Sequence, residues 1–539
     1  MPTLNWIGKE AVVNHHRQVP FHLLKDVPDL ACGEPGEGNL IVQGDNLVAL
    51  KALLPYYAGQ VKCIYIDPPY NTGNENWVYN DNVNSPLMRE WLGKVVGKEG
   101  ETLDRHDRWL CMMYPRLALL RQFLREDGAI FISLDDNEIH ALRYAMDEIF
   151  GPDNFITTVL WQKVYSPKNS ARHFSEDHDY IVVYAKKAEV WKPNLVPRSE
   201  DQDSAYKNRD NDPRGAWKTS DLSGRNPYSE GLYPVTCPSG RIIAGPPKGR
   251  YWTISKEKFA AFDSEKRIWW GKTGNSIPQL KRFLSEVKQG VVPQTMWFYN
   301  EVGHTQDAKK ELLQLIDFPD SESVFITPKP TRLIERIIQI AASPGDLVLD
   351  SFAGSGTTGH SVLKLNQATL DQEPRRFILV EMEPGIAREI TAERVRRVAQ
   401  GYKNVKGESI DGLGGGFRYC ELGEPLFDES GKIRETVSFA DLARHVYFTE
   451  TGEPLPRGRV TKSPFLGECR GVGVYLLYNG ILDDKSAQGG NVLTRAVLAK
   501  LPKFDGQKVI YCAGGLWGKD RLQAERILIR QTPYEIKVS

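Results

Sequence analysis

The sequence predicts an α/β fold in which a doubly wound sheet is interrupted by an inserted domain. Short apolar runs alternate with segments of helical spacing before residue 160 and again after residue 320. Between these two parts the alternation stops, and Pro, Gly, Asn and Trp become frequent. A glycine-rich turn at 354–359 stands between a predicted strand and a predicted helix, as in many ligand-binding sheets of this class.

The first part of the predicted sheet contains three strands. Residues 40–43 read as a strand, followed by a turn at 44–46 and a helix at 47–56. Residues 61–66 form a short apolar run that ends at proline, which is typical of a buried parallel strand whose carboxyl end carries Asp67. Residues 108–127 have helical spacing, and 128–151 read as a strand and then a helix.

The second part resumes the same alternation. We expect a helix at 331–342, a turn at 343–345, a strand at 347–349, the glycine loop and another helix. The next strand ends at Glu381, and a further helix covers 391–400. These patterns predict four regions: a first part of the main domain at 1–160, an insert at 161–320, a second part at 321–400, and a small mixed C-terminal domain at 401–539.

Composition excludes several classes of protein. The 539 residues are 41% hydrophobic and 26% charged, which is ordinary for a globular chain with more than one domain. Seven Cys, an odd number without a CxxC pair, indicate a reducing compartment with neither a disulfide framework nor a zinc ribbon. There is no apolar run near 18 residues and no signal peptide, so we expect a cytoplasmic protein that does not contact the membrane.

The positive charge is concentrated in the insert, although the formal net charge of the chain is zero. Residues 161–300 hold 23 Lys and Arg against 15 Asp and Glu, together with seven of the twelve Trp. Basic residues interleaved with aromatic ones suit a surface that touches phosphates and bases. An ordinary domain with a modest positive excess explains the charge equally well.

The glycine loop predicts a nucleotide-like ligand. Gly354, Gly356 and Gly359 satisfy G-x-G-x-x-G between a strand and a helix, where the backbone can approach a ligand and the helix N-terminus attracts an anion. Glu381 closes the next strand, 25 residues after Gly356, where an acid can accept hydrogen bonds from ribose hydroxyls. The pattern fits NAD, FAD or S-adenosylmethionine (SAM), and a glycine-rich turn without any ligand stays open as an alternative.

The stretch Asp67-Pro68-Pro69-Tyr70 narrows the choice. An exocyclic amine on an aromatic base is a poor nucleophile, because its lone pair is delocalised into the ring. Asp67 can offer a carboxylate and the stiff Pro68 a fixed carbonyl to the amino protons, while Tyr70 can stack on a base taken out of the duplex. Transfer of a methyl group then depends on positioning and electrostatics and needs no metal. The alternative is a proline turn with a capping acid and a packed tyrosine.

These motifs resemble those of amino-directed DNA methyltransferases. The D-P-P-Y motif at 67–70 comes first, the F-x-G-x-G SAM loop of "DSFAGSGTT" comes last, and a large insert lies between them, which resembles the β class. Further stretches, among them "GAIFISLDDNE", "MDEIFGPDNF" and "KKELLQL", look like the modification subunits of type III restriction systems and their solitary relatives. The resemblance covers roughly residues 1–425 and implies a Rossmann-like, SAM-dependent methyltransferase sheet with a target-recognition domain at 161–320.

The resemblance also implies residue roles. Asp67 and Pro68 would hold the target amino group in a catalytic loop completed by Pro69 and Tyr70, and Tyr70 would stack on the flipped base. Glu381 would take the SAM ribose. The other implied cofactor-binding residues are Asp45 near the adenine, Thr327, Lys329 and Pro330 at the methionine end, Asp350, which orients the loop, and the loop itself at Phe352, Ala353, Gly354, Ser355, Gly356 and Thr357.

Other candidate residues have simpler explanations. Asp45 can equally be the N-cap of the helix that follows it. Trp269-Trp270 can be domain core as well as base-contacting. Surface or core positions explain the remaining histidine candidates, which are His15-His16, His106 and His140.

An Asp in the first motif position favours adenine N6 over cytosine N4, so the expected reaction is N6 methylation of adenine in double-stranded DNA. N4 methylation of cytosine stays an alternative. A second alternative is a DNA-recognition subunit of a restriction or defence complex with little activity of its own. A nicotinamide-dependent oxidoreductase leaves the 67–70 motif unexplained. The resemblance implies a homodimer and makes a restriction helicase-nuclease partner plausible, and the C-terminal region could serve either contact.

Overall fold

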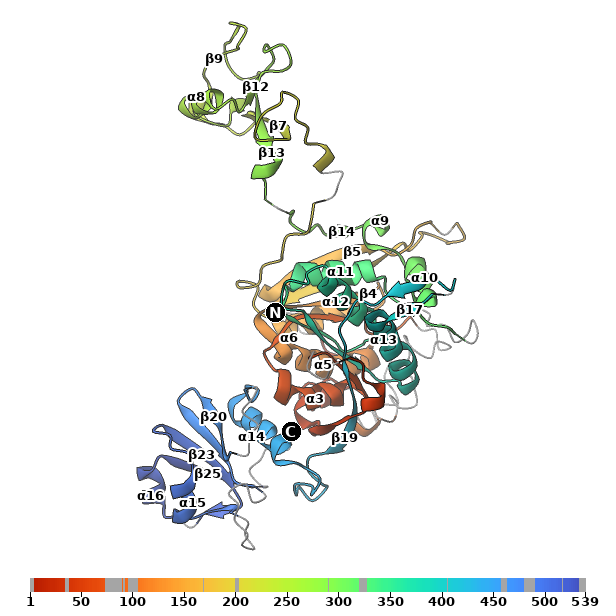
Figure 1. Ribbon diagram of the computed structural model, residues 1–539, viewed down its shortest axis with the longest axis vertical. Helices are drawn as coiled ribbons and strands as arrows, with labels where there is room; N and C mark the ends of the chain where they lie inside the picture. Colours follow the sequence, from red (N-terminus) through yellow and green to blue (C-terminus); the bar gives the residue numbers. More distant parts are fainter. Residues whose placement is uncertain are drawn as a thin grey trace. The chain divides into compact units, whose positions relative to one another are not determined.

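A computed structural model describes most of the chain (Figure 1). The described residues are 4–33, 38–72, 90, 93–95, 105–167, 169–198, 203–288, 290–318, 327–404, 406–456, 463–478, 490–515 and 517–532. The chain divides into two compact units: unit 1 is 1–194 with 294–539, and unit 2 is Leu195–Pro293.

Unit 1 is built on a ten-stranded mixed sheet of order β1-β19-β2-β16-β15-β3-β4-β6-β5-β14. The six adjacent strands from β19 to β4 run parallel to one another, and β14 runs parallel to β5. The other three pairings, which are β1 with β19, β4 with β6 and β6 with β5, are antiparallel. The bounds are β1 His22–Asp26, β2 Leu40–Gln43, β3 Val61–Ile66, β4 Leu124–Leu134, β5 Phe155–Gln162, β6 His178–Ala185, β14 Met296–Trp297, β15 Leu347–Asp350, β16 Arg376–Glu381 and β19 Arg418–Pro425.

Helices form two groups that pack against this sheet (Figure 1). One group is α3 Asn46–Tyr57, α5 Arg105–Phe123 and α6 Ile139–Phe150, and the other is α11 Thr331–Ala341, α12 Thr357–Gln367 and α13 Glu393–Gln400. The sequence explains the packing of α11, because its residues 333, 334, 337, 338 and 341 are buried along one stripe. The central strands are mostly apolar because helices cover both faces, so the predicted α/β doubly wound class is confirmed.

Shorter elements complete unit 1 up to residue 404. They are α1 Lys9–Val12, α2 His15–Gln18, the 3-10 turns Pro28–Leu30 and Pro152–Asn154, α9 Tyr299–Val302, α10 Thr305–Leu315, a π-helical turn Ile386–Ala392 and β17 Gly401–Lys403. Among the described residues, no helix is long and apolar enough to cross a membrane.

Unit 2 is a small domain around a three-stranded antiparallel sheet, β12-β13-β7. Leu222, Tyr233, Trp252, Phe259 and Trp270 contribute to its apolar core. Its elements are β7 Trp217–Asp221, β8 Ser223–Gly224, the 3-10 turns Ser229–Gly231 and Leu284–Glu286, β9 Val235–Thr236, β10 Ile242–Ile243, β11 Tyr251–Trp252, α8 Lys256–Ser264, β12 Ile268–Trp269 and β13 Gln279–Phe283.

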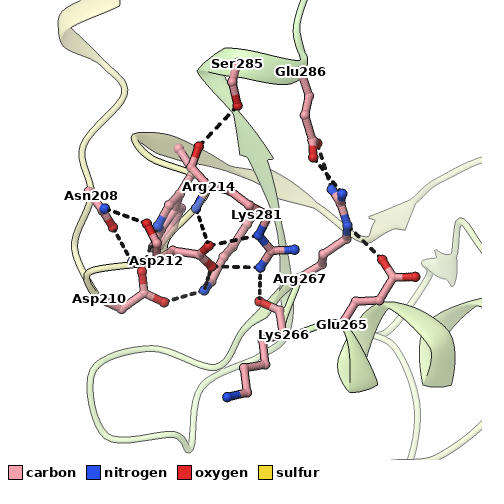
Figure 2. Close-up of polar contacts among 11 residues, drawn as sticks. Asn208, Asp210, Asp212, Arg214, Glu265, Lys266, Arg267, Lys281, Ser285 and Glu286 are labelled. Atoms are coloured by element: carbon pink, nitrogen blue, oxygen red, sulfur yellow. Dashed lines mark hydrogen bonds and ion pairs between the residues drawn. The ribbon is translucent and has the colours of Figure 1, made fainter.

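A network of charged side chains lies against the sheet of unit 2 (Figure 2). Lys281 on β13 is 5% exposed and forms ion pairs with Asp210 and Asp212. Asp212 also accepts two bonds of 2.8 Å from the Arg214 guanidinium, and these cations hold the pKa of its carboxyl well below the usual range. A buried cation is tolerated here because it is paired with carboxylates.

The compact unit is narrower than the insert expected at 161–320. Strand β6 pairs with β4, and β5 pairs with β6, so these two strands extend the large sheet. Residues 161–194 belong to unit 1. Residues 294–318 also belong to unit 1. The α/β alternation stops at residue 161 because β5 and β6 are antiparallel neighbours that need no helix between them.

The C-terminal region is joined to the large sheet at its start. β19 pairs with β1 and β2, so the sheet continues past residue 401, where a separate domain was expected to begin. A second, four-stranded sheet has the order β20-β21-β23-β25. The elements are β18 Ser409–Asp411, α14 Phe439–Thr451, β20 Phe465–Cys469, β21 Val472–Leu476, β22 Val492–Leu493, α15 Arg495–Lys500, β23 Gln507–Cys512, β24 Gly514–Gly515, α16 Lys519–Ala524 and β25 Ile527–Gln531.

Candidate active site

Acidic residues follow four adjacent parallel strands at their carboxyl ends. Asp45 comes after β2, Glu381 ends β16, Asp350 ends β15, and Asp67 comes after β3. Parallel strands present their carboxyl ends at one edge of a sheet, and ligands of open α/β sheets bind there, where the strand order reverses. The chain continues outward from β15 to β16 in one direction and from β3 to β4 in the other, which places that reversal between β15 and β3.

The glycine loop connects β15 to α12 in a conformation that requires glycine. Gly354 and Gly356 have φ values of 50° and 75°, in the left-handed region that other residues rarely adopt. A Cβ at Gly359 would lie 2.9 Å from Val395 and 3.1 Å from Leu379, so this third glycine lets α12 pack closely on its neighbours. The three glycines of the motif therefore serve the turn and the packing of the helix.

Glu381 holds the glycine loop from the neighbouring strand. Its carboxylate is 4% exposed and accepts a 2.9 Å bond from the backbone N–H of Gly354 and another of 2.9 Å from Glu383 N–H. The sequence-predicted ribose acid and the loop are thus in direct contact.

Asp350 also forms hydrogen bonds with the glycine loop and with the start of α12. Its carboxylate accepts from Phe352 N–H at 3.0 Å and from the Thr358 hydroxyl at 2.5 Å. Burial raises the pKa of this carboxyl to about 7, above the ordinary value near 3.8, because the charged form loses its hydration. Ala353 is also buried, and its N–H donates to Val380 across the strands at 3.0 Å.

A buried arginine supports the far side of the loop. Arg394 on α13 is fully buried, and its guanidinium donates to the hydroxyls of Ser355 at 3.1 Å and Thr357 at 2.8 Å. Burial lowers the pKa of this guanidinium. The sequence motif names Ser355 and Thr357 but gives no sign of the arginine, which lies 37 positions beyond Thr357.

Lys329 links the glycine loop to the D-P-P-Y loop. Its ammonium forms an ion pair with Asp67 Oδ2, and its backbone carbonyl accepts a 3.2 Å bond from the Thr357 hydroxyl. The same ammonium lies 5.2 Å from the centre of the Tyr70 ring, a cation–π contact. The other carboxylate oxygen, Asp67 Oδ1, is buried and has no hydrogen-bond partner among the described residues.

Asp179 lies beside Tyr70 and was not identified from the sequence. The Tyr70 hydroxyl is 3.4 Å from Asp179 Oδ2, and the other oxygen of this buried carboxylate pairs with Lys163 at 2.6 Å. Burial raises the pKa of Asp179, and burial with the Asp179 and Asp67 charges raises that of Tyr70 well above its usual value. Asp179 is the second residue of β6 and lies inside the predicted insert. Its position beside the motif therefore follows only from the antiparallel pairing of β6 with β4.

Asn71, the residue after the D-P-P-Y motif, is held by hydrogen bonds of its side chain. Asn71 is 2% exposed with a left-handed φ of 57°, and its side-chain amide donates to Arg105 O at 2.9 Å and to the Glu138 carboxylate. Glu138 also accepts from His106 Nδ1 at 2.7 Å, and burial raises its pKa. Trp109 Nε1–H donates to Pro69 O at 2.7 Å.

The remaining predicted residues lie at the borders of this arrangement. Asp45 caps α3 by accepting from Leu47 and Val48 N–H, and its second oxygen pairs with the buried Arg116 at 2.8 Å. Its neighbour Asn46 donates to Ser351 O at 3.0 Å, which places the 44–46 turn against the loop after β15. Pro330 is the N-cap of α11, and Thr327 lies three residues before it. Residues 73–81, which follow the motif, lie outside the described residues.

Comparison with known proteins finds a family whose model matches the residues of this site. The model of the DNA methylase family N6_N4_Mtase matches residues 61–393, which include the D-P-P-Y loop, unit 2 and the glycine loop. This chain belongs to that DNA methylase family.

Relatives of this DNA methylase are modification subunits of type III restriction-modification enzymes. The StyLTI Mod subunit of Salmonella typhimurium is 34% identical over 426 residues, covering 74% of this chain and 62% of the relative. The EcoP15I Mod subunit of Escherichia coli is 30% identical over 453 residues, covering 75% and 67%. The EcoPI Mod subunit of Escherichia phage P1 is 30% identical over 444 residues, covering 75% and 66%. The matched part thus spans about two thirds of these relatives, and the predicted resemblance to Mod subunits is confirmed.

Proposed function

We propose that this DNA methylase transfers a methyl group from SAM to the N6 amine of adenine in double-stranded DNA. The observation that carries the proposal is the pairing of two loops at one edge of the sheet. The D-P-P-Y loop holds a buried acceptor, Asp67 Oδ1, that has no hydrogen-bond partner in the part of the chain that the structure describes. The glycine loop beside it is bound to the carboxylate of Glu381. Lys329 connects the two loops through Asp67 and Thr357.

The residues at this edge fit SAM. A ribose needs an acid at the end of the strand after the glycine loop, and Glu381 has that position. The methionine carboxylate of SAM needs a cation or free N–H groups, and Lys329 is a buried cation next to the loop. In this proposal the cofactor-binding residues are those predicted from the sequence, from Asp45 to Glu381. SAM supplies an electrophilic methyl group when it is bound.

The chain's own residues then prepare the amine. Asp67 Oδ1 and the Pro68 carbonyl accept the two amino protons, which draws the nitrogen lone pair out of conjugation with the ring. Lys329 holds Asp67 Oδ2, so the carboxylate keeps Oδ1 directed at the target. Tyr70 stacks on the flipped base, and its hydroxyl is anchored by Asp179. After transfer, the surplus proton on nitrogen passes to Asp67 Oδ1.

Support for adenine comes from the Asp at the first motif position, since the family resemblance associates it with adenine N6. We propose that unit 2 is the target-recognition domain. Two features support this: unit 2 lies between the two motifs in the sequence, and residues 195–293 hold 17 Lys and Arg against 11 Asp and Glu. The relatives are named as Mod subunits of restriction-modification enzymes, which supports another subunit of such an enzyme as a partner of this chain. We propose a restriction helicase-nuclease subunit as that partner, and we propose a homodimer from the family resemblance alone.

Nucleoside mass spectrometry tests the proposed reaction. Duplex DNA is incubated with the protein and methyl-labelled SAM, digested, and searched for labelled bases, beside an Asp67→Ala control. Labelled N6-methyladenine from wild type alone is the expected result. Labelled N4-methylcytosine would overturn the choice of base. Absence of label with SAM binding intact would favour the alternative of a recognition subunit.

A further inference from the structure

The sheet of unit 2 carries two kinds of cationic side chain. On one face, every cation drawn in Figure 2 except the exposed Lys266 is matched by carboxylates. Lys281 pairs with Asp210 and Asp212, and Arg214 pairs with Asp212. Arg267 likewise pairs with Glu286 at 2.6 Å and Glu265 at 2.9 Å. These contacts explain the paired cations as parts of the domain's own structure.

The opposite face of the same strands is different. Neighbouring residues of a strand point to opposite faces, so Arg282 lies on the other side of β13 from Lys281. In the antiparallel register of β13 with β7, Arg282 is directly opposite Lys218, while Phe283 is opposite Trp217 and Lys281 is opposite Thr219. Burial agrees with this division, because Trp217, Lys281 and Phe283 are buried, whereas Lys218 and Arg282 are exposed.

A cross-strand pair of cations is unfavourable for the fold. Directly opposite side chains in antiparallel strands have Cβ atoms about 5 Å apart, and like charges there are destabilising. Neither Lys218 nor Arg282 forms an ion pair with any acid in the part of unit 2 that the structure describes. The ammonium of Lys218 lies 4.9 Å from the centre of the Tyr206 ring, a cation–π contact. On β7 and β13 the third cation, Lys281, is thus paired with carboxylates, whereas Lys218 and Arg282 are adjacent and form no ion pair with any described residue.

We propose that Lys218 and Arg282 form a phosphate-binding surface of unit 2 that holds the backbone of duplex DNA. The inference rests on the proposed function and names the face by which unit 2 contacts its substrate. Two cations this close together match one phosphate or two neighbouring phosphates, and Lys and Arg are the residues that bind them. The surplus of positive charge in 195–293, a net +6, favours a polyanion over an acidic small molecule.

The same face explains why these two cations are exposed while their neighbours are not. Further along the strands, Leu222, Leu280 and Ile268 pack into the apolar core of the unit. Lys218 and Arg282 lie toward the other end of the paired strands, next to Phe283 and Trp217, where that core does not cover the face. The surface is therefore accessible to a ligand without unfolding any part of the domain.

The test measures DNA binding by the full-length protein as a function of salt. A fluorescein-labelled 30-base-pair duplex is titrated with wild type, Lys218→Ala, Arg282→Ala and the double variant, over a range of KCl concentrations. A double variant on α8, Lys256→Ala with Lys258→Ala, removes the same charge from another exposed part of unit 2. Each lost phosphate contact should reduce the slope of log K against log[KCl] by about 0.9 and weaken binding roughly five- to tenfold at 0.1 M salt.

Thermal melting tests whether the variants lose DNA affinity without losing stability. Because the two cations repel each other, each single variant should melt at the wild-type temperature or slightly above it, although it binds DNA more weakly. Binding lost together with stability would indicate a structural role and overturn the proposal. An unchanged salt slope, or an equal loss in the α8 control, would also overturn it.

Methyl transfer separates this proposal from the proposed function. If wild type methylates DNA but the Lys218 and Arg282 variants bind it normally, the surface is wrong and the enzyme stands. If binding depends on the two cations but no methyl group is transferred to any DNA, the surface stands and the proposed reaction falls.

Discussion

The side-chain amide of Asn71 donates to the buried carboxylate of Glu138, although the two residues are 67 positions apart. Asn71 directly follows the D-P-P-Y motif, and Glu138 stands at the start of α6. The bond spans from the loop after β3 to the loop after β4, two neighbouring strands. It holds the backbone of Asn71 in a left-handed turn, and so sets the direction in which Tyr70 and Asp67 point.

Substitutions of Asn71 separate the turn from the hydrogen bond. Asn71→Gly keeps the left-handed φ without strain but loses the amide, whereas Asn71→Ala loses the bond and adds a backbone cost of about 1 kcal/mol or more. We expect methyl transfer to fall in the order wild type, Asn71→Gly, Asn71→Ala, with a loss on the order of 10- to 100-fold for Ala. Initial rates with labelled SAM at saturating DNA give the order, and equal rates for Gly and Ala would show that the turn is unimportant.

Lys329 and Asp67 should act as a unit. Lys329→Met keeps the length of the side chain but removes its charge, so Asp67 loses the partner that holds Oδ2. We expect at least tenfold slower methyl transfer for Lys329→Met and for Asp67→Asn, and a double variant little worse than the slower single one, because both remove the same arrangement. A double-mutant cycle on kcat measures the coupling. Additive losses would mean that the two side chains contribute independently.

Tyr70 is expected to act through its ring more than through its hydroxyl. Tyr70→Phe keeps the ring and loses a long hydrogen bond to Asp179, so methyl transfer should stay within a few-fold of wild type. Tyr70→Ala removes the stacking surface, which is worth about 1–3 kcal/mol per base, so the rate should fall roughly 10- to 100-fold. Fluorescence of 2-aminopurine at the target position reports the flipped base. If Tyr70→Phe were as slow as Tyr70→Ala, the hydroxyl and not the ring would be the group of Tyr70 that matters for methyl transfer.

The strands and helices that carry the motifs could be predicted because each has a strong local signal. Runs such as 40–43 and 61–66 are mostly apolar, since parallel strands are covered on both faces, and the structure places β2 and β3 at those residues. The predicted strand at 347–349 is extended by one residue to Asp350, and the helix predicted at 331–342 ends at Ala341. Motif spacing then located both loops, because glycine turns and acids at strand ends are local features.

The supports of the site have no comparable local signal. Arg394, Asp179 and Glu138 contact the motifs from elements that are distant in the chain, and each reads in the sequence as an ordinary charged residue. Their importance appears only when the order of strands is known. Unit 2 is shorter than the predicted insert at 161–320 for a related reason, because β5 and β6 join the sheet as antiparallel neighbours and break the α/β alternation.

Asp350 should make the stability of unit 1 depend on pH. Its pKa in the folded protein is about 7, above the ordinary value near 3.8, so the folded state binds this proton more tightly than the unfolded chain. The stabilisation from this group is fully present below pH 4 and is lost as pH rises toward 7, with a slope of at most about 1.4 kcal/mol per pH unit. Asp350→Asn keeps the shape and removes the titration. Denaturant unfolding of both proteins between pH 4 and 8 should show the difference in stability shifting in favour of the variant as pH rises. A constant difference would contradict the raised pKa.

Lys281 should stabilise unit 2 and leave the cofactor site unaffected. Lys281→Met places an apolar side chain of similar length against Trp217, but it leaves Asp210 without its cation, while Asp212 keeps Arg214. Breaking a buried ion pair on one side costs about 3–5 kcal/mol, so unit 2 should melt earlier and be cleaved sooner by protease. SAM binding, measured by calorimetry, should be unchanged because all proposed cofactor residues lie in unit 1. The matched variant Lys281→Arg keeps the charge and should recover most of the lost stability. Loss of SAM affinity in Lys281→Met would show that the two units are energetically coupled.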